Sequence, residues 1–159
     1  VVVAAPAEVE PVPIEFYGVT VVRDKVAHRG PVAALALGLD SIAGDAAFAC
    51  SCDLPMLRVD VALALAGMLE DYDAVIPEVG SLLRPLHAVY RKACLDELRA
   101  IEREGEARLE ELIGRINARV VVEEELRELD RDLVSFFSIT TPADYERALE
   151  LSKDPFGAS

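Results

Sequence analysis

The sequence predicts one α/β domain with a mostly parallel sheet, and three observations support this fold class. Short apolar runs rich in valine and alanine alternate with helical patterns along the chain, as strands and crossover helices do in βαβ units. The 159 residues, 52% of them hydrophobic, suffice for one domain with its own core. No internal repeat or linker divides the chain, so we assign residues 1–151 to the domain and residues 152–159 to a tail.

The first half of the chain predicts three strands and two helices. Strands are expected at residues 1–5, 19–22 and 46–52, where small and β-branched apolar residues follow one another. The pair Gly30-Pro31 begins an alanine- and leucine-rich helix, because proline suits the first helical position. A second helix is expected over residues 60–69. Since the chain opens in mid-strand, we also expect further residues upstream of Val1.

The second half predicts further strands and helices in alternation. Strands are expected at residues 72–79 and 119–125, and residues 85–93 combine a strand with the start of a helix. That helix continues to the glycine at position 105, and a second amphipathic helix is expected over residues 109–116. The charged run at residues 102–111 is typical of a solvated helix face. In the last helix, Thr141 is the expected cap, Pro142 the first residue and Asp144 the partner in a capping box.

Charge and cysteine content limit the classes of function. A net charge of -13 opposes general binding to nucleic acid or anionic membranes, which needs clustered lysine and arginine. No apolar run approaches the roughly 18 residues of a membrane span, and no signal peptide is apparent, so we expect a cytoplasmic protein. Cys50, Cys52 and Cys94 are expected to be buried thiols in a reducing compartment; a metal-binding pair at Cys50 and Cys52 is the weaker alternative.

A carboxylate follows the strand expected at residues 46–52. Burying an unpaired carboxylate is costly, whereas ligands of open α/β sheets bind outside the carboxyl ends of the strands. Asp53 is therefore a candidate ligand of Mg²⁺, which usually binds one or two carboxylates together with substrate phosphates. The alternative is that Asp53 caps the following turn.

A second acid, Asp24, follows the strand at residues 19–22. Further along this loop, Gly30 permits close approach of a ligand to the backbone, and the helix that begins at Pro31 presents unpaired N–H groups. The basic residues at positions 25, 28 and 29 can attract an anion. The alternative is an ordinary loop between strand and helix with surface charges.

The segment RPLHAVYR, residues 84–91, carries Arg84, His87, Tyr90 and Arg91. We favour a structural role for His87 over proton donation, because a histidine on an apolar strand is more often structural. Contact with a substrate through shape or hydrogen bonding is the alternative. The sequence has no Ser-His-Asp arrangement, no zinc spacing and no glycine-rich phosphate loop.

Together these motifs resemble the MobA family of nucleotidyltransferases. The family pattern is an Asp after a strand, then Gly-Pro-Leu-Ala-Gly, Cys-Asp-Met/Leu-Pro, Pro-Leu-His-Ala-x-Tyr-Arg and Phe-x-Asn-Ile-Asn-Thr-Pro-Glu-Asp. Here the order is Asp24, GPVAAL, CDLPML, RPLHAVYR and FFSITTPAD, and the resemblance reaches from the first residue to about Leu151. It implies a three-layer, Rossmann-like sheet of the nucleotide-diphospho-sugar transferase type, with the first βα unit missing.

The resemblance also implies an activity, namely transfer of GMP from GTP to molybdopterin with Mg²⁺ and release of pyrophosphate. By position, Asp53 would be the catalytic residue and metal ligand, and the partners would be GTP and molybdopterin. The implied nucleotide-binding residues are Asp24, Gly30, Pro31 and Asp53, and the implied substrate-binding residues are His87, Tyr90, Ser138 and Thr140. We expect a monomer or a weak homo-oligomer.

Three departures from the family pattern leave alternatives open. The family's Leu-x-Gly-Gly-x-Ser-x-Arg-Met-Gly-x-x-Lys loop does not occur in this sequence, so the chain as given is expected to be a poor catalyst. Ser138 and Thr140 replace two asparagines, and Ala34 replaces a glycine. The alternatives are a transferase that uses CTP or another phosphorylated acceptor, a non-catalytic nucleotide-binding relative, and an unrelated α/β domain.

Overall fold

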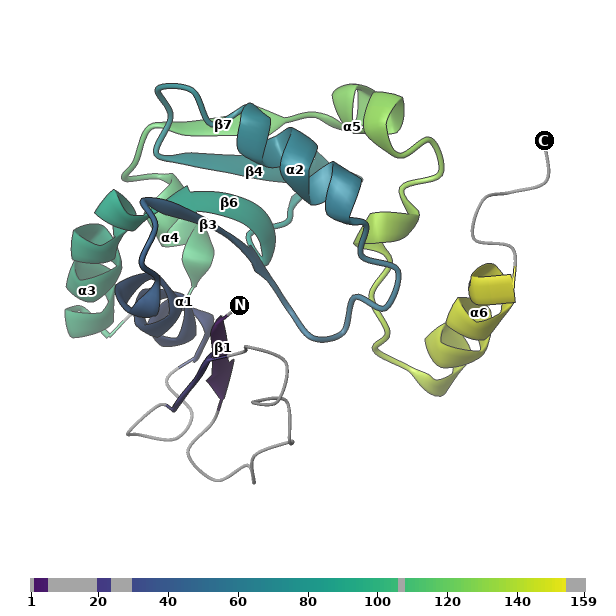
Figure 1. The fold of residues 1–159 in the computed structure, drawn as a ribbon, viewed down its shortest axis with the longest axis horizontal. Coiled ribbons are helices and arrows are strands. Elements are labelled where there is room, and N and C mark those ends of the chain that lie inside the picture. The colour runs from purple at the N-terminus through teal and green to yellow at the C-terminus, as the bar shows by residue number, and fades with distance from the viewer. Residues whose placement is uncertain (1, 6–19, 24–29, 106–107, 154–159) are drawn as a thin grey trace.

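The computed structural model describes residues 2–5, 20–23, 30–105 and 108–153 and confirms the α/β fold class (Figure 1). Most of the expected elements are present, with ends that differ by a few residues from those predicted. In chain order the strands and α-helices are β1 Val2–Ala5, β2 Thr20–Arg23, α1 Gly30–Ser41, β3 Ala46–Cys50, α2 Val59–Gly67, β4 Ala74–Val79, β5 Leu82–Leu83, β6 His87–Arg91, α3 Leu95–Arg103, α4 Leu109–Ile113, β7 Ala118–Val121, α5 Glu123–Leu129 and α6 Pro142–Lys153.

The main sheet has the strand order β3-β6-β4-β5, and β7 also pairs with β4. Strands β3, β4 and β7 run in one direction, because β7 is parallel to β4 while β6 is antiparallel to both β3 and β4. The sheet is therefore mixed, with β6 as the reversed strand. Strands β1 and β2 form a separate parallel pair, which lies below α1 in Figure 1.

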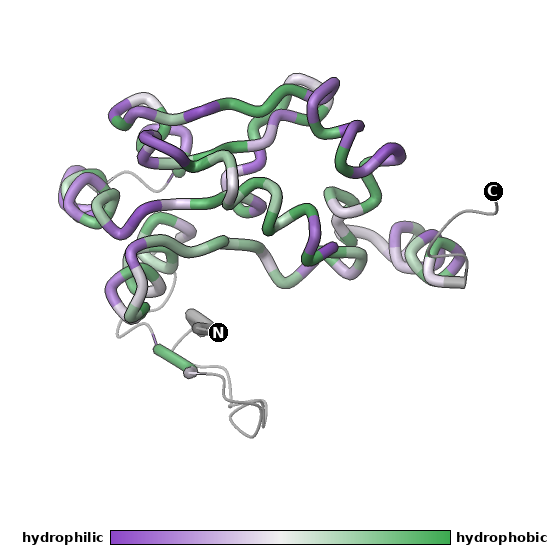
Figure 2. Tube along the Cα trace, turned by 45° about the horizontal axis from the view of Figure 1, so that its top comes forward, coloured by the Kyte–Doolittle hydropathy of each residue, from purple (hydrophilic) through white to green (hydrophobic). Residues whose placement is uncertain are grey.

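Helices cover both faces of the main sheet, as the three-layer expectation requires. On one face α1, α3 and α4 pack against the sheet through a cluster that includes Leu39, Ile76 and Ile101. On the other face α2 and α5 pack through a cluster that includes Leu65 and Val75. Val75 and Ile76 are neighbours in β4, point to opposite faces and are both 0% exposed, as expected of a strand covered on both sides. Figure 2 shows the hydrophobic residues concentrated along these strands and the hydrophilic ones at the turns.

The strand expected at residues 119–125 is shorter than predicted, because α5 was missed. Strand β7 ends at Val121, and the glutamates at positions 123–125 form the first turn of α5. Acidic side chains stabilise the positive end of the helix dipole, and Glu125 Oε2 also accepts a hydrogen bond from the backbone N–H of Val122 at 3.4 Å. The three glutamates, which favour the start of a helix, therefore outweigh the β propensity of the preceding valines.

The start of α6 agrees with the prediction. Thr141 Oγ1 accepts a hydrogen bond from the Asp144 N–H at 3.2 Å, and Asp144 Oδ2 accepts one from the Thr141 N–H at 2.8 Å. These reciprocal bonds are the predicted capping box.

The cysteine prediction is only partly right. Cys94 is buried, but Cys50 and Cys52 are exposed, because β3 is the edge strand of the described main sheet and both residues lie at or beyond its end. Within the described ranges, no helix is both long enough and apolar enough to cross a membrane.

Candidate active site

A pocket of about 210 Å³ opens at the carboxyl end of β3. Three segments form it: the turn after β3, the residues at the start of β6, and the residues around the 3₁₀ helix Val134–Phe136. The lining residues are Ser51, Asp53, Leu54, Leu83, Arg84, Pro85, Leu86, His87, Phe136 and Ser138.

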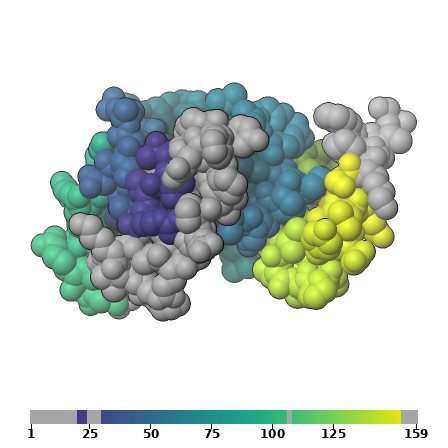
Figure 3. Space-filling model, turned by 60° about the horizontal axis from the view of Figure 1, so that its bottom comes forward, coloured from purple at the N-terminus to yellow at the C-terminus, as the bar shows by residue number. Residues whose placement is uncertain are grey.

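Backbone hydrogen bonds hold the three segments together. The Ile139 N–H donates to the Asp53 carbonyl at 2.9 Å, and the Ser51 N–H donates to the Leu86 carbonyl at 3.1 Å. Figure 3 shows the yellow-green residues before α6 lying against the blue residues that follow β3. Segments far apart in the sequence therefore meet at the place where open α/β sheets bind ligands.

Asp53 lies in the turn just beyond β3 and is half-buried at the pocket wall. Its Oδ1 accepts a hydrogen bond from the Ser51 hydroxyl, and Oδ2 has no partner among the described residues. This contact comes from a side chain before Asp53 and is not the cap of the following turn that the alternative expected, and the second oxygen is available to a ligand.

The donor set of this pocket fits Mg²⁺ only in combination with a substrate. The described residues contain no group of three or more His, Cys, Asp or Glu side chains that could hold a metal. Mg²⁺ typically keeps several waters and binds through one or two carboxylates plus substrate phosphates. A single carboxylate with one unbound oxygen is consistent with that mode of binding.

His87 forms part of the pocket wall and is 2% exposed. Its ring lies 4.2 Å from that of Phe136 and 5.2 Å, edge-on, from that of Phe48, measured between centroids. Burial lowers the pKa of His87 to about 4; the charge of Asp130 opposes this shift, and that of Arg84 adds to it. The imidazole is therefore neutral at pH 7.

Both ring nitrogens of His87 are buried without a hydrogen-bond partner in the described structure. A neutral imidazole has one donor and one acceptor, and buried polar atoms normally find partners. His87 lines the pocket, but both nitrogens are closed off from solvent, so a bound molecule would reach them only after a small shift of the pocket wall.

The other predicted site residues separate into two groups. Ser138 lines the pocket. Tyr90 does not, because it points to the opposite face of the sheet, where it is 0% exposed and its hydroxyl donates to the Pro85 carbonyl at 2.8 Å. Thr140 is exposed, and its N–H and hydroxyl donate to Asp144 Oδ2 at 3.1 and 2.9 Å. The substrate contacts expected at Tyr90 and Thr140 thus have no support in this geometry.

Of the predicted nucleotide-binding residues, Asp53 lines this pocket, and the other three do not line it or lie outside the described ranges. Gly30 and Pro31 begin α1 and do not line the pocket. Gly30 has a φ of 76°, a backbone conformation that favours glycine. This conformation explains why a glycine occupies the position without any contact to a ligand. Asp24 lies outside the described residues, so its position relative to Asp53 is untested.

Sequence reasoning missed the contributions of Ser51, Phe136 and the Arg84 guanidinium to the pocket. Ser51 comes two residues before Asp53, and Arg84 three before His87, so each belongs to a motif that was already identified. Their closeness in sequence to Asp53 and His87 was the available signal. It could not show which side chains face the pocket, because that depends on where β3 ends and β6 begins.

Comparison with known proteins agrees with the motif order. Residues 1–120 match the model of the MobA-like NTP transferase domain. A molybdenum cofactor guanylyltransferase from Desulfosudis oleivorans is 32% identical over 139 residues, which cover 86% of this chain and 69% of that protein. A probable molybdenum cofactor guanylyltransferase from Pelotomaculum thermopropionicum is 29% identical, over 86% of this chain and 67% of that protein.

Solved structures agree as well. The molybdopterin-guanine dinucleotide biosynthesis protein A of Archaeoglobus fulgidus superposes with a TM-score of 0.76 at 28% identity, covering 87% of this chain and 71% of that one. The 2-C-methyl-D-erythritol 4-phosphate cytidylyltransferase of Thermus thermophilus has a TM-score of 0.69 at 16% identity, covering 96% and 81%, and supports the fold alone. From the matched domain, the relatives and the shared fold, this chain belongs to the MobA-like NTP transferase domain family.

Proposed function

We propose that this protein is a molybdenum cofactor guanylyltransferase, which transfers GMP from GTP to molybdopterin and releases pyrophosphate. The main support is that relatives with this name match most of the chain, 86% of it in each of two cases. GTP and molybdopterin are the proposed substrates, and the cytoplasm, where GTP is available, is the proposed location.

In this reaction an oxygen of the molybdopterin phosphate forms a bond to the α-phosphorus of GTP. The bond from that phosphorus to the oxygen bridging to the β-phosphate breaks, and pyrophosphate leaves with the electron pair. A phosphate monoester has its second pKa near 6, so at pH 7 the attacking group is mostly a dianion and needs no base from the protein. This is consistent with a neutral His87 and with the lack of a protein nucleophile.

We assign the roles as follows. Asp53, together with substrate phosphates, would hold Mg²⁺, which when bound neutralises phosphate charge. Asp24, Gly30 and Pro31 would bind the nucleotide. His87 and Ser138 would offer hydrogen bonds to the acceptor, and the Phe136 ring would provide an apolar wall.

The test is a transfer assay with the full-length protein, Mg²⁺, molybdopterin and α-labelled GTP or CTP. We expect label from GTP to appear in a guanine dinucleotide product with an equal amount of pyrophosphate, and transfer from CTP to be at least about tenfold slower. Preference for CTP would point to the cytidylyl alternative, and GTP binding without transfer to a non-catalytic relative. The 159 residues alone contain no glycine-rich phosphate loop, so we expect them to be a poor catalyst.

A further inference from the structure

Arg84 lines the pocket, and its side chain forms no hydrogen bond or ion pair with a described residue. The side chain is half-buried, and its Nε is fully buried with no hydrogen-bond partner. Buried donors on charged groups are normally paired, so this arginine is unusual.

Two opposite charges therefore line one pocket without pairing. Asp53 bonds to the Ser51 hydroxyl and not to Arg84, although both side chains line the same cavity. A ligand that carries an anion next to a cation would satisfy both residues, with the anion at Arg84 and the cation at Asp53.

The rest of the pocket indicates which anion this is. Gly30 and Pro31, on the proposed nucleotide side, are absent from the lining. The lining instead includes Phe136, His87 and Ser138, that is, an aromatic ring, an imidazole and a hydroxyl-bearing residue. These groups suit a flat heterocycle with polar edges, and because Gly30 and Pro31 are absent from the lining we assign the pocket to the pterin acceptor and not to the guanine of the nucleotide.

We propose that Arg84 binds the phosphate group of the acceptor substrate and holds it beside Asp53. This inference rests on the proposed function, because only that reaction supplies a phosphorylated pterin. The planar guanidinium can donate two parallel hydrogen bonds to a phosphate, which fixes the direction of its oxygens as well as its position. Arg84 thereby selects phosphorylated over unphosphorylated acceptors.

The test compares binding of 6-hydroxymethylpterin and of its monophosphate by isothermal titration calorimetry. We expect the wild-type protein to bind the monophosphate about 10- to 100-fold more tightly, the usual effect of charge-assisted hydrogen bonds. Arg84→Met should remove this preference, and Arg84→Lys should keep part of it, because lysine retains the charge without the fork. Arg99→Met is the matched control, since Arg99 pairs with Asp40 at 3.1 Å on the surface and does not line the pocket.

The inference fails if the wild-type protein does not prefer the monophosphate, or if Arg84→Met retains the preference. It also fails if Arg84→Met weakens GTP binding and leaves pterin phosphate binding unchanged. If circular dichroism shows that Arg84→Met does not fold, Arg84→Lys becomes the test. A preference for the monophosphate that is weaker than in the wild-type protein then supports the inference, and an unchanged preference refutes it. These binding measurements are independent of the transfer assay. If the protein catalyses transfer but its preference for the monophosphate does not depend on Arg84, only this inference is refuted. If the preference depends on Arg84 but no transfer occurs, only the proposed function is refuted.

Discussion

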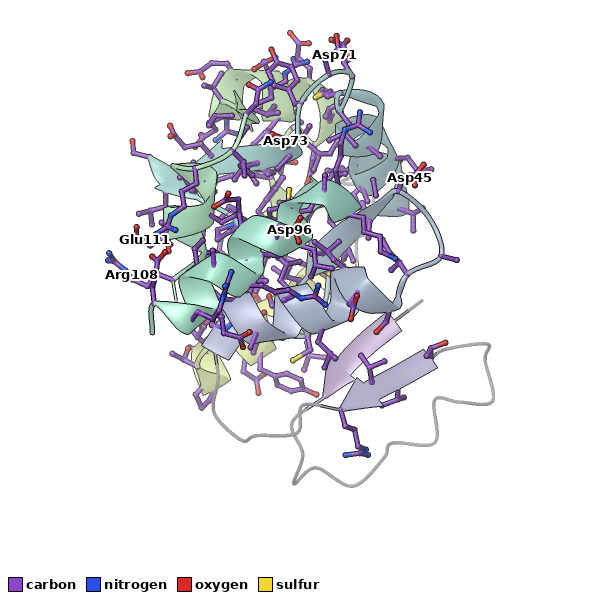
Figure 4. All side chains as sticks on the ribbon, turned by 90° about the vertical axis from the view of Figure 1, so that its left-hand side faces the viewer. Asp45, Asp71, Asp73, Asp96, Arg108 and Glu111 are labelled. Carbon is purple, nitrogen blue, oxygen red and sulfur yellow. The ribbon has the colours of Figure 1, made fainter. Side chains whose placement is uncertain are left out.

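Two arginines of the same motif, Arg84 just before β6 and Arg91 at its carboxyl end, differ in how their side chains are hydrogen-bonded. At the carboxyl end, Arg91 donates from Nε to the Tyr72 carbonyl at 2.9 Å and from its terminal nitrogen to the Glu70 carbonyl. Nearby, Asp73 Oδ2 accepts a hydrogen bond from the Asn117 N–H at 3.0 Å. Figure 4 looks toward this side of the molecule and labels Asp73 with other acidic residues around it.

At the other end, polar atoms lie buried without partners. Among the described residues these include Nε of Arg84, both ring nitrogens of His87 and the hydroxyl of Ser135. Since folding normally satisfies buried polar groups, we infer that the Arg91 end serves the fold and the Arg84 end serves a ligand. Each prediction below tests this contrast, from the largest expected effect to the smallest.

Removing the charge of Asp53 should have the largest effect. Asp53→Asn is expected to lower the transfer rate by on the order of 1,000-fold, because a metal bound to phosphates contributes several kcal/mol of charge stabilisation. The melting temperature should change little. Asp71→Asn, at an exposed acid on the other side, is the matched control and should keep full activity. Equal rates for the two variants would place the metal away from Asp53.

Burial of a neutral His87 should make stability depend on pH. Its pKa is about 4 in the folded protein, against the ordinary 6.5, so between these values the unfolded chain binds more protons. Stability contributed by neutral His87 is therefore complete above about pH 6.5 and is lost as the pH falls toward 4, by up to about 3 kcal/mol. Urea unfolding from pH 4 to 8 measures this effect. His87→Asn should flatten the curve in that window, and an unchanged slope would contradict the account.

Removing the charge should affect stability at Arg91 but not at Arg84. Arg91→Met is expected to cost about 1–2 kcal/mol of unfolding free energy, because it leaves backbone carbonyls without donors. Arg84→Met should change that free energy by less than about 0.5 kcal/mol, since no contact within the described protein is lost. Urea denaturation of both variants gives the comparison. A larger loss for Arg84→Met would show that Arg84 has a structural role.

Removing the hydroxyl of Ser135 should not destabilise the protein. Its side chain is 0% exposed and its hydroxyl has no partner in the described structure. Ser135→Ala removes a buried polar atom that contributes no hydrogen bond, so stability should stay the same or rise by up to about 1 kcal/mol. A loss of more than 1 kcal/mol, measured by urea unfolding, would mean that this hydroxyl is satisfied in solution.

The sequence predicted the elements well where the pattern is local. Glycine and proline mark the start of α1, and the Thr141–Asp144 capping box marks that of α6, because these signals depend on neighbouring residues. The reversal of β6 was not predictable in this way, since strand direction depends on pairing between segments far apart in the chain.

The same distinction applies to the site. Asp53 was identified because a carboxylate after an apolar strand is a local anomaly. Tyr90 and His87 belong to one motif but point to opposite faces, and only the register of β6 reveals which of them reaches the pocket. Whether Arg84 finds a hydrogen-bond partner depends on all the surrounding side chains, so its lack of a partner could not be predicted from a sequence pattern.

The most direct test of the central claim is to locate the metal. Crystals of the full-length protein grown with Mn²⁺ and GTP would show the ion by its anomalous scattering. We predict an anomalous peak within coordination distance of the Asp53 carboxylate, in contact with nucleotide phosphates. A peak at the opposite end of the sheet, near Asp71 and Asp73, or a nucleotide bound with its phosphates away from Asp53, would contradict the account.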